Sequence, residues 1–201
     1  MAGRAYFDTR KANNQFPLPE NWFVDFRVPE DKDTGFEATI FKNTATKEIV
    51  ISFAGTYDQS GVDKFADEAL WAGVFHMQLL QACKSYLDVK ANAPINTQIS
   101  LTGHSLGGGL AALVAVYFGV NATTFDQAPF RSSTLSYNDR DVAAQVLQRL
   151  QSETKTAIAD GVDKQVPRYS IDQLAGLNTF VSSVEHQTSW NQQPSPVATI
   201  R

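Results

Sequence analysis

The pattern of apolar and polar residues predicts strands that alternate with helices up to about residue 125. Four segments have the alternation or the β-branched composition of strands: residues 36–41, 48–53, 98–102 and 122–125. Residues 74–89 carry an apolar stripe at helical spacing, and residues 110–118 are apolar almost all round and end at Gly119. Strands that alternate with helices indicate an α/β fold, with a mostly parallel sheet and helices on both faces.

The two ends of the chain have other patterns. Residues 1–35 are rich in turn-forming residues and predict an extended lead-in over the core, with three aromatic side chains as packing anchors: Trp22, Phe23 and Phe26. Residues 139–159 and 171–184 show helical spacing, and Ser170 and Gln173 form a capping-box signature. We therefore expect residues 131–190 to be a helical insertion in a single domain that spans residues 1–201.

The composition excludes several classes of protein. The chain has 201 residues, 43% of them hydrophobic, and a formal net charge of -4, which argues against nucleic acid as a partner. The single cysteine excludes an internal disulfide, and the three histidines lack metal-ligand spacing. The N-terminus has no apolar signal-peptide region, and no apolar run is long enough to span a membrane. We expect a chain that is cytoplasmic when synthesised, with at most peripheral membrane contact; export without an N-terminal signal stays open.

The segment between the strand at 98–102 and the apolar helix contains the pattern Gly-x-Ser-x-Gly. We call residues 103–107, with Gly103, Ser105 and Gly107 at the fixed positions, the Ser105 turn. This pattern between a strand and a helix is typical of a nucleophile elbow, in which a strained turn exposes the serine hydroxyl. Glycines on both sides leave room for neighbouring backbone. The pattern predicts that Ser105 is a catalytic nucleophile.

An acyl-transfer site also needs donors for the oxyanion of the tetrahedral intermediate. Such donors are backbone N–H groups, one after the nucleophile and one in the loop after a neighbouring strand. Leu106 follows Ser105 directly, and Thr56 follows the strand at 48–53. We therefore expect the N–H groups of Thr56 and Leu106 to form the oxyanion hole. Residues 57–73 come next, and they are interpreted equally well as a lid or as a surface helix.

The proton acceptor for Ser105 is harder to assign. His104 adjoins the serine, so its side chain is expected to point away, and His76 comes too early in the chain order of this class of enzyme. His186 is left by elimination, although its place at a predicted helix end fits an ordinary surface histidine equally well. Among the acids, Asp163 in a predicted loop is preferred to Asp160 at a helix end. Asp126, after the strand at 122–125, is expected to shape the rim of the site.

Four segments together resemble the class 3 lipase family of α/β-hydrolases: residues 49–56 with their aromatic-x-Gly-Thr ending, residues 74–76, the Ser105 turn and residues 124–129. The resemblance covers somewhat under half of the chain. It implies an α/β-hydrolase fold and a serine hydrolase that cleaves carboxylic esters of lipids without metal or cofactor. The chain is most similar to bacterial lipases and phospholipases. Some of these are antibacterial effectors that are exported without a signal peptide and are neutralised by an immunity protein.

The chain departs from that family in one respect. The family places its aspartate and histidine after two further strands, whereas residues 131–190 predict two helices. A second hypothesis is therefore that the domain is incomplete, with the acid and base supplied downstream of residue 201 or by a second chain. Two other functions stay open: a non-catalytic hydrolase-like protein that binds a lipid or a partner, and an esterase or thioesterase with a non-lipid substrate.

Overall fold

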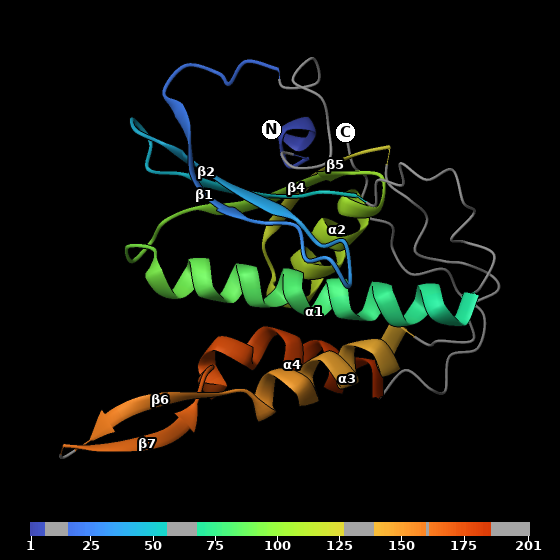
Figure 1. The fold of residues 1–201 in the computed structure, drawn as a ribbon, viewed down its shortest axis with the longest axis vertical. Helices are drawn as coiled ribbons and strands as arrows, with labels where there is room; N and C mark the ends of the chain where they lie inside the picture. Colours follow the sequence, from blue (N-terminus) through green and yellow to red (C-terminus); the bar gives the residue numbers. More distant parts are fainter. Residues whose placement is uncertain (7–15, 56–67, 127–138, 160, 186–201) are drawn as a thin grey trace. The chain divides into compact units, whose positions relative to one another are not determined.

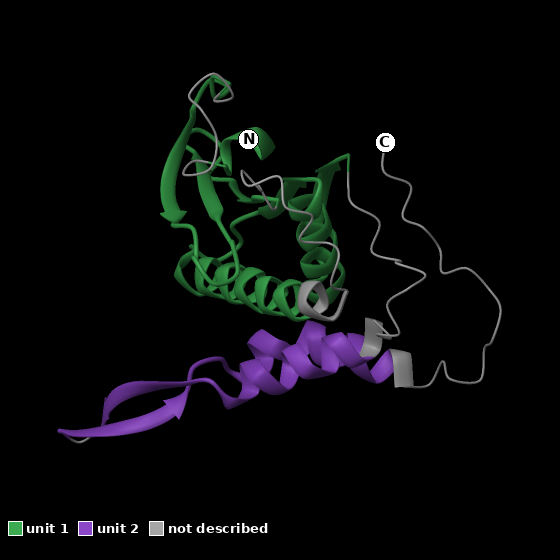
Figure 2. Ribbon diagram, turned by 45° about the vertical axis from the view of Figure 1, so that its right-hand side comes forward, with its two compact units in different colours: residues 1–136 green, residues 137–201 purple. Residues whose placement is uncertain are grey.

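The computed structural model of the chain describes residues 1–6, 16–55, 68–126, 139–159 and 161–185 (Figure 1). The chain divides into two compact units, residues 1–136 and residues 137–201 (Figure 2). The boundary lies close to residue 131, where the predicted insertion begins. Whether the second unit is an insertion within one hydrolase domain stays a prediction. Each unit is described separately below.

The first unit is built on a five-stranded sheet whose strands follow one another in chain order. The strands are β1 (Trp22–Val28), β2 (Ala38–Asn43), β3 (Ile49–Phe53), β4 (Ile99–His104) and β5 (Asn121–Phe125). β1, β2 and β3 pair antiparallel, whereas β3, β4 and β5 pair parallel. The predicted α/β class is confirmed. The sheet is mixed rather than mostly parallel, because β1 and β2 add an antiparallel half.

Two helices connect the parallel strands. Helix α1 (Glu68–Asn92) joins β3 to β4, and helix α2 (Leu106–Phe118) joins β4 to β5. Both lie on the same side of the sheet (Figure 1). The two described α-helices of this unit thus share one face, and the opposite face carries a short 3-10 helix of the N-terminal segment. The physical reason is that right-handed crossovers between parallel strands in chain order bring successive helices to one face.

The opposite face of the sheet is covered by the N-terminal segment, which begins with the short 3-10 helix η1 (Ala2–Arg4). A row of hydroxyl side chains crosses the sheet there, because Thr39, Ser52 and Thr102 are paired in register on adjacent strands and are all buried. Thr39 Oγ1 donates to the backbone oxygen of Arg4 at 3.5 Å, and Ser52 Oγ donates to that of Met1 at 3.5 Å. The hydroxyl row thus binds the N-terminal segment to the sheet.

The second unit contains two helices and a hairpin: α3 (Asp139–Ser152), β6 (Thr154–Ala159), β7 (Val162–Pro167) and α4 (Ile171–Glu185). β6 and β7 pair antiparallel, and the apolar sides of α3 and α4 pack on each other. The prediction of one helix over residues 139–159 is wrong, since the helix ends at Ser152. Beyond it the sequence alternates in the manner of a strand and reaches the Asp160-Gly161 dipeptide, a hairpin-turn signature.

Two further differences concern the first unit. The predicted lead-in contains the edge strand β1, and the side chains of Phe23 and Phe26 are 41% and 59% exposed instead of being anchored in the core. Helix α1 begins at Glu68, earlier than the predicted residue 74. Most of the candidate lid, residues 57–67, lies outside the described residues.

Candidate active site

The Ser105 turn lies between the end of β4 and the start of α2. Ser105 has φ 54° and ψ −127°, a positive φ that residues with a side chain rarely adopt. Its N–H donates to the backbone oxygen of Phe125 at 3.1 Å, and its own carbonyl accepts from the N–H of Gly109 at 3.1 Å. Hydrogen bonds on both sides therefore hold the serine in this conformation, and the strand–turn–helix context expected from the motif is present.

The two glycines of the turn are required by close backbone contacts. A Cβ atom at Gly103 would overlap the backbone of Gly107 and would lie 2.6 Å from the backbone nitrogen of Gly108. A Cβ atom at Gly107 would overlap the carbonyl oxygen of Phe53 and would lie 2.7 Å from the backbone carbon of Ala54. No side chain fits at either position without moving backbone. The start of α2 therefore passes directly against the end of β3.

This close passage brings Gly55, the residue before the expected donor Thr56, beside the Ser105 turn. Leu106 is the first residue of α2, and the first N–H groups of a helix have no partner within it. Gly55, one residue before Thr56, lies beside the turn: a Cβ atom there would be 2.9 Å from the carbonyl oxygen of His104 and 3.3 Å from the nitrogen of Gly107. Thr56 itself lies outside the described residues, so its role stays a prediction.

His104 points to groups on either side of the turn. Its Nε2 atom lies 3.8 Å from Oδ2 of Asp126, at the end of β5, and its Nδ1 atom lies 3.4 Å from the hydroxyl of Tyr6. The side chains of His104 and Asp126 are 39% and 93% exposed. Asp126 also has a positive φ of 43°. That Asp126 shapes the rim of the site stays a prediction.

The predicted base and acid are not brought to Ser105 by the described residues. His186 and Asp160 lie outside them. Asp163 is part of the second unit, on strand β7 rather than in the predicted loop, and is exposed with Ile158 as its cross-strand neighbour. The roles of His186 and Asp163 in a catalytic triad stay predictions.

The family model that matches this chain is that of the Tle-like phospholipase domain, over residues 21–175. The match covers β1 to β7, with the Ser105 turn inside it. The chain belongs to the Tle-like phospholipase family. The kinship with lipases and phospholipases that the sequence predicts is thereby confirmed.

This Tle-like chain is also similar to named proteins. It is 32% identical over 149 residues to the extracellular phospholipase A1 of Serratia liquefaciens, an alignment that spans 74% of this chain and 42% of that protein. Among solved structures, Lip2 lipase from Yarrowia lipolytica is 17% identical with a TM-score of 0.40, over 63% of this chain and 54% of that one. A triacylglycerol lipase from Penicillium expansum is 20% identical with a TM-score of 0.34, over 61% and 53%. The chain therefore matches less than half of the Serratia enzyme's length.

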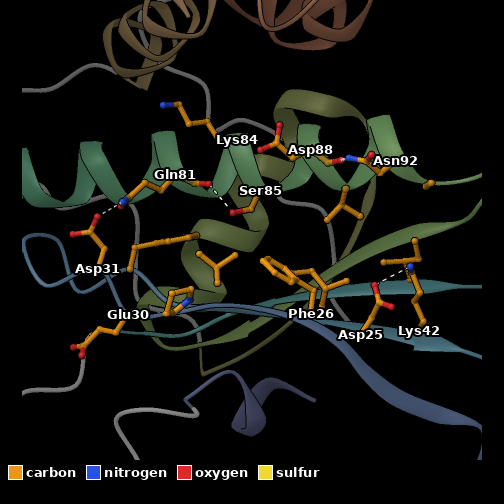
Figure 3. Close-up of a pocket in the computed structure, with 17 residues that line it drawn as sticks. Asp25, Phe26, Glu30, Asp31, Lys42, Gln81, Lys84, Ser85, Asp88 and Asn92 are labelled. Carbon is orange, nitrogen blue, oxygen red and sulfur yellow. Dashed lines mark hydrogen bonds and ion pairs between the residues drawn. The ribbon is translucent and has the colours of Figure 1, made fainter. Parts of the chain in front are cut away.

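The Tle-like chain also contains a cavity of about 770 Å³ between α1 and the antiparallel half of the sheet (Figure 3). One wall is apolar and comes mainly from the strands: Phe26, Val28, Phe36, Ile40 and Ile49. The other wall is a polar stripe of α1 whose side chains hydrogen-bond within the chain. Gln81 Nε2 donates to Asp31 Oδ2 at 2.8 Å, and Ser85 Oγ donates to the backbone oxygen of Gln81 at 2.9 Å. None of the residues of the Ser105 turn lines this cavity, so it is not where Ser105 would meet a substrate.

Three other properties of the described residues concern metal binding, cysteine reactivity and membrane spans. No group of three or more His, Cys, Asp or Glu side chains in them could hold a metal ion. Cys83 lies fully buried on α1, and burial raises the pKa of its thiol well above the usual value, so the thiol is a packing group as predicted. None of the helices in the described ranges combines the length and apolar composition that a membrane span requires.

Proposed function

We propose that this Tle-like phospholipase is a serine hydrolase that cleaves carboxylic ester bonds of lipids, with Ser105 as the nucleophile. The observation that carries the proposal is the backbone of Ser105, held at φ 54° at the strand-to-helix turn between two glycines at which a Cβ atom would overlap backbone. A strained conformation persists only where the surrounding fold stabilises it, and such conformations are concentrated at functional sites. Membership of the phospholipase family supports a lipid ester as the substrate.

The proposed reaction has two steps. Ser105 Oγ attacks the ester carbonyl carbon as its proton passes to a histidine, for which His186 is the candidate, with Asp163 as the orienting acid. The N–H groups of Thr56 and Leu106 stabilise the negative oxygen, and the start of α2 adds the positive end of its helix dipole. The C–O bond to the leaving alcohol breaks and the alcohol takes the proton. Water then attacks the acyl-enzyme and releases the carboxylic acid.

A Ser105→Ala variant tests the nucleophile. We expect it to lose hydrolysis of phospholipids and short-chain esters by at least about 1,000-fold, because the acyl-enzyme can no longer form. The unfolding midpoint should stay the same or rise, and labelling by a fluorophosphonate, seen in the wild type, should disappear. A wild-type chain that is not labelled would favour a non-catalytic lipid-binding protein. A Ser105→Ala chain with full activity would contradict the mechanism.

A His186→Ala variant tests whether the base lies in this chain. Loss of ester hydrolysis with retained folding would support His186. Unchanged hydrolysis would mean that another histidine of this chain acts as the base. Absence of activity in the wild type, recovered on adding a second chain, would support a base supplied from outside these 201 residues.

We also propose that the chain acts outside the cytoplasm and that an immunity protein neutralises it. The name of the Serratia relative, an extracellular phospholipase A1, supports the first part, and the resemblance to antibacterial phospholipases supports the second. Bacteria that direct the chain to the periplasm should stop growing, whereas the Ser105→Ala variant should be harmless there. Equal growth with both chains would contradict the proposal.

A further inference from the structure

Tyr6 lies beneath the Ser105 turn, although 98 residues separate it from His104. It follows η1 and is 2% exposed, in a buried cluster with Ala5 and Ala54. Its hydroxyl donates to the backbone oxygen of His104 at 3.3 Å and lies 3.4 Å from Nδ1 of the same residue. The hydroxyl thus contacts both the backbone and the ring of the residue that precedes the serine.

The same hydroxyl also meets the other side of the site. A Cβ atom at Gly55 would lie 2.7 Å from Tyr6 Oη, closer than real Cβ atoms come to their neighbours. Gly55 connects β3 to Thr56, the expected oxyanion donor. Tyr6 Oη therefore lies where the end of β3 and the Ser105 turn approach each other.

The contacts to His104 involve its ring as well as its backbone. Tyr6 Oη lies 3.4 Å from Nδ1, and Nε2 lies 3.8 Å from Oδ2 of Asp126, so the ring lies between the tyrosine hydroxyl and the carboxylate. A tyrosine hydroxyl both donates and accepts hydrogen bonds, so it can bond to Nδ1 in either tautomer of the ring.

We propose that Tyr6 is a positioning residue for ester hydrolysis: it fixes the backbone before Ser105 relative to the strand end that carries the oxyanion donor. The proposal rests on the proposed function. Its physical reason is that the attacking oxygen and the oxyanion donors belong to different segments. A displacement of one segment by about 1 Å can reduce the rate about 100-fold. Tyr6 donates a hydrogen bond to the backbone of His104, next to the serine. It thereby holds the distance between the Ser105 turn and the end of β3 without contacting the substrate.

A Tyr6→Phe variant removes the hydroxyl and keeps the ring. We expect kcat for a soluble short-chain ester to fall about tenfold or more while KM stays within about twofold, because binding surfaces are unchanged and only the alignment of nucleophile and donors is lost. The rate of fluorophosphonate labelling at Ser105 should fall by a similar factor. The matched control is Tyr86→Phe, since Tyr86 is 1% exposed in the same unit and packs on Phe118. That control should lose stability without a change in kcat.

Nitrogen NMR of the histidine rings provides an independent readout. In Tyr6→Phe the ring nitrogen resonances of His104 should shift from their wild-type values, because Nδ1 loses the hydroxyl that lies 3.4 Å away. A tyrosine that only packs would leave these resonances unchanged. If Tyr6→Phe does not fold, 4-fluorophenylalanine at position 6 replaces it: fluorine fills the volume of the hydroxyl without donating a hydrogen, so kcat and the labelling rate should fall in the same way.

Unchanged kcat and labelling in a folded chain with phenylalanine or 4-fluorophenylalanine at position 6 would overturn the proposal. A fall in kcat that Tyr86→Phe reproduces would also overturn it, because the effect would then be general loss of stability. Failure of the proposed function looks different: the wild type itself would not be labelled at Ser105.

Discussion

At Gly107 two stretches of backbone pass very close to each other. The position that a Cβ atom would take is already occupied by the carbonyl group of Phe53 and by the backbone of Ala54. Backbone cannot rotate away in the manner of a side chain, so the end of β3 or the start of α2 would have to move. Both segments belong to the candidate site.

We therefore expect Gly107→Ala to lower the free energy of unfolding by about 3 kcal/mol or more, since overlap with fixed backbone is among the most destabilising kinds of substitution. Urea unfolding followed by circular dichroism measures this. The matched control is Gly73→Ala in α1, where a Cβ atom would meet nothing within 4 Å. That change should stabilise the chain by about 0.5–1 kcal/mol, because alanine favours helix over glycine. Similar midpoints for the two variants would contradict the packing argument.

At the scale of single residues, the sequence predicts those that belong to a local motif. It misses those that only the three-dimensional fold brings to the site. Gly103, Ser105 and Gly107 are recognisable because their roles depend on a five-residue turn. Tyr6 gave no signal, because its contact with His104 depends on the path of the N-terminal segment over the sheet. A tyrosine in an unpatterned segment is indistinguishable from an ordinary packing residue.

Among the elements, helix α4 has the most clearly defined start. Ser170 and Gln173 form both bonds of the predicted capping box: the Ser170 N–H donates to Gln173 Oε1 at 2.8 Å, and the Gln173 N–H donates to Ser170 Oγ at 3.2 Å. Such reciprocal bonds satisfy N–H groups that the helix leaves without partners. The start of α4 thus follows from four residues of sequence.

Ser170→Ala removes one of these bonds and should lower the free energy of unfolding by about 1 kcal/mol, the usual effect of losing an N-cap side chain. The loss should be measured in the thermal unfolding of the second unit, through the helical signal. Ser182→Ala, an exposed position in the interior of the same helix, serves as the control and should be neutral or slightly stabilising. An equal loss in both variants would show that the cap contributes nothing specific.

Element types were predicted best where one pattern ran for the whole element. The strands β2 to β5 and the helices α2 and α4 follow this rule. The hairpin of β6 and β7 was missed because the helical spacing of residues 139–150 was extended past Ser152, over a segment that alternates instead. The sequence does not predict β1, because this edge strand is largely exposed and carries aromatic side chains on its surface. It therefore lacks the alternation of apolar and polar residues that a buried face produces.

The two units differ in how much apolar surface they bury. In the described part of the second unit the buried hydrophobic residues are few: Ala143, Val146, Leu147, Leu150, Tyr169, Leu174, Leu177 and Val181. Its hairpin has only two strands, which are marginally stable on their own. The first unit has a five-stranded sheet with covered faces and a larger core.

We therefore expect hydrogen exchange to be uneven across the molecule. Backbone amides of α3, α4, β6 and β7 should exchange at least about tenfold faster than those of β3, β4 and α2, because a small core opens at a lower free-energy cost. Mass spectrometry of peptides after timed labelling measures the difference. Equal protection in both units would show that they unfold as one cooperative structure.

The whole-molecule arrangement of the catalytic groups is the part that sequence predicts least. The proposed nucleophile Ser105 and Leu106 belong to one local turn, whereas an acid and a base come from distant segments and are defined only by their final positions. Asp163 illustrates the difficulty. The sequence predicts a loop at this residue, whereas it lies exposed on a strand of the second unit.

The backbone of Ser105 has a consequence for the history of the family. Its conformation costs a residue with a side chain about 1–3 kcal/mol, and glycine would adopt it with far less strain. Stability alone therefore favours glycine at this position, and the proposed function gives the reason for serine, because catalysis needs the hydroxyl. Descendants that have given up hydrolysis should lose the serine early and keep Gly103 and Gly107, whose place depends on packing. The residue at position 105 should therefore distinguish relatives that hydrolyse esters from relatives that retain only the fold.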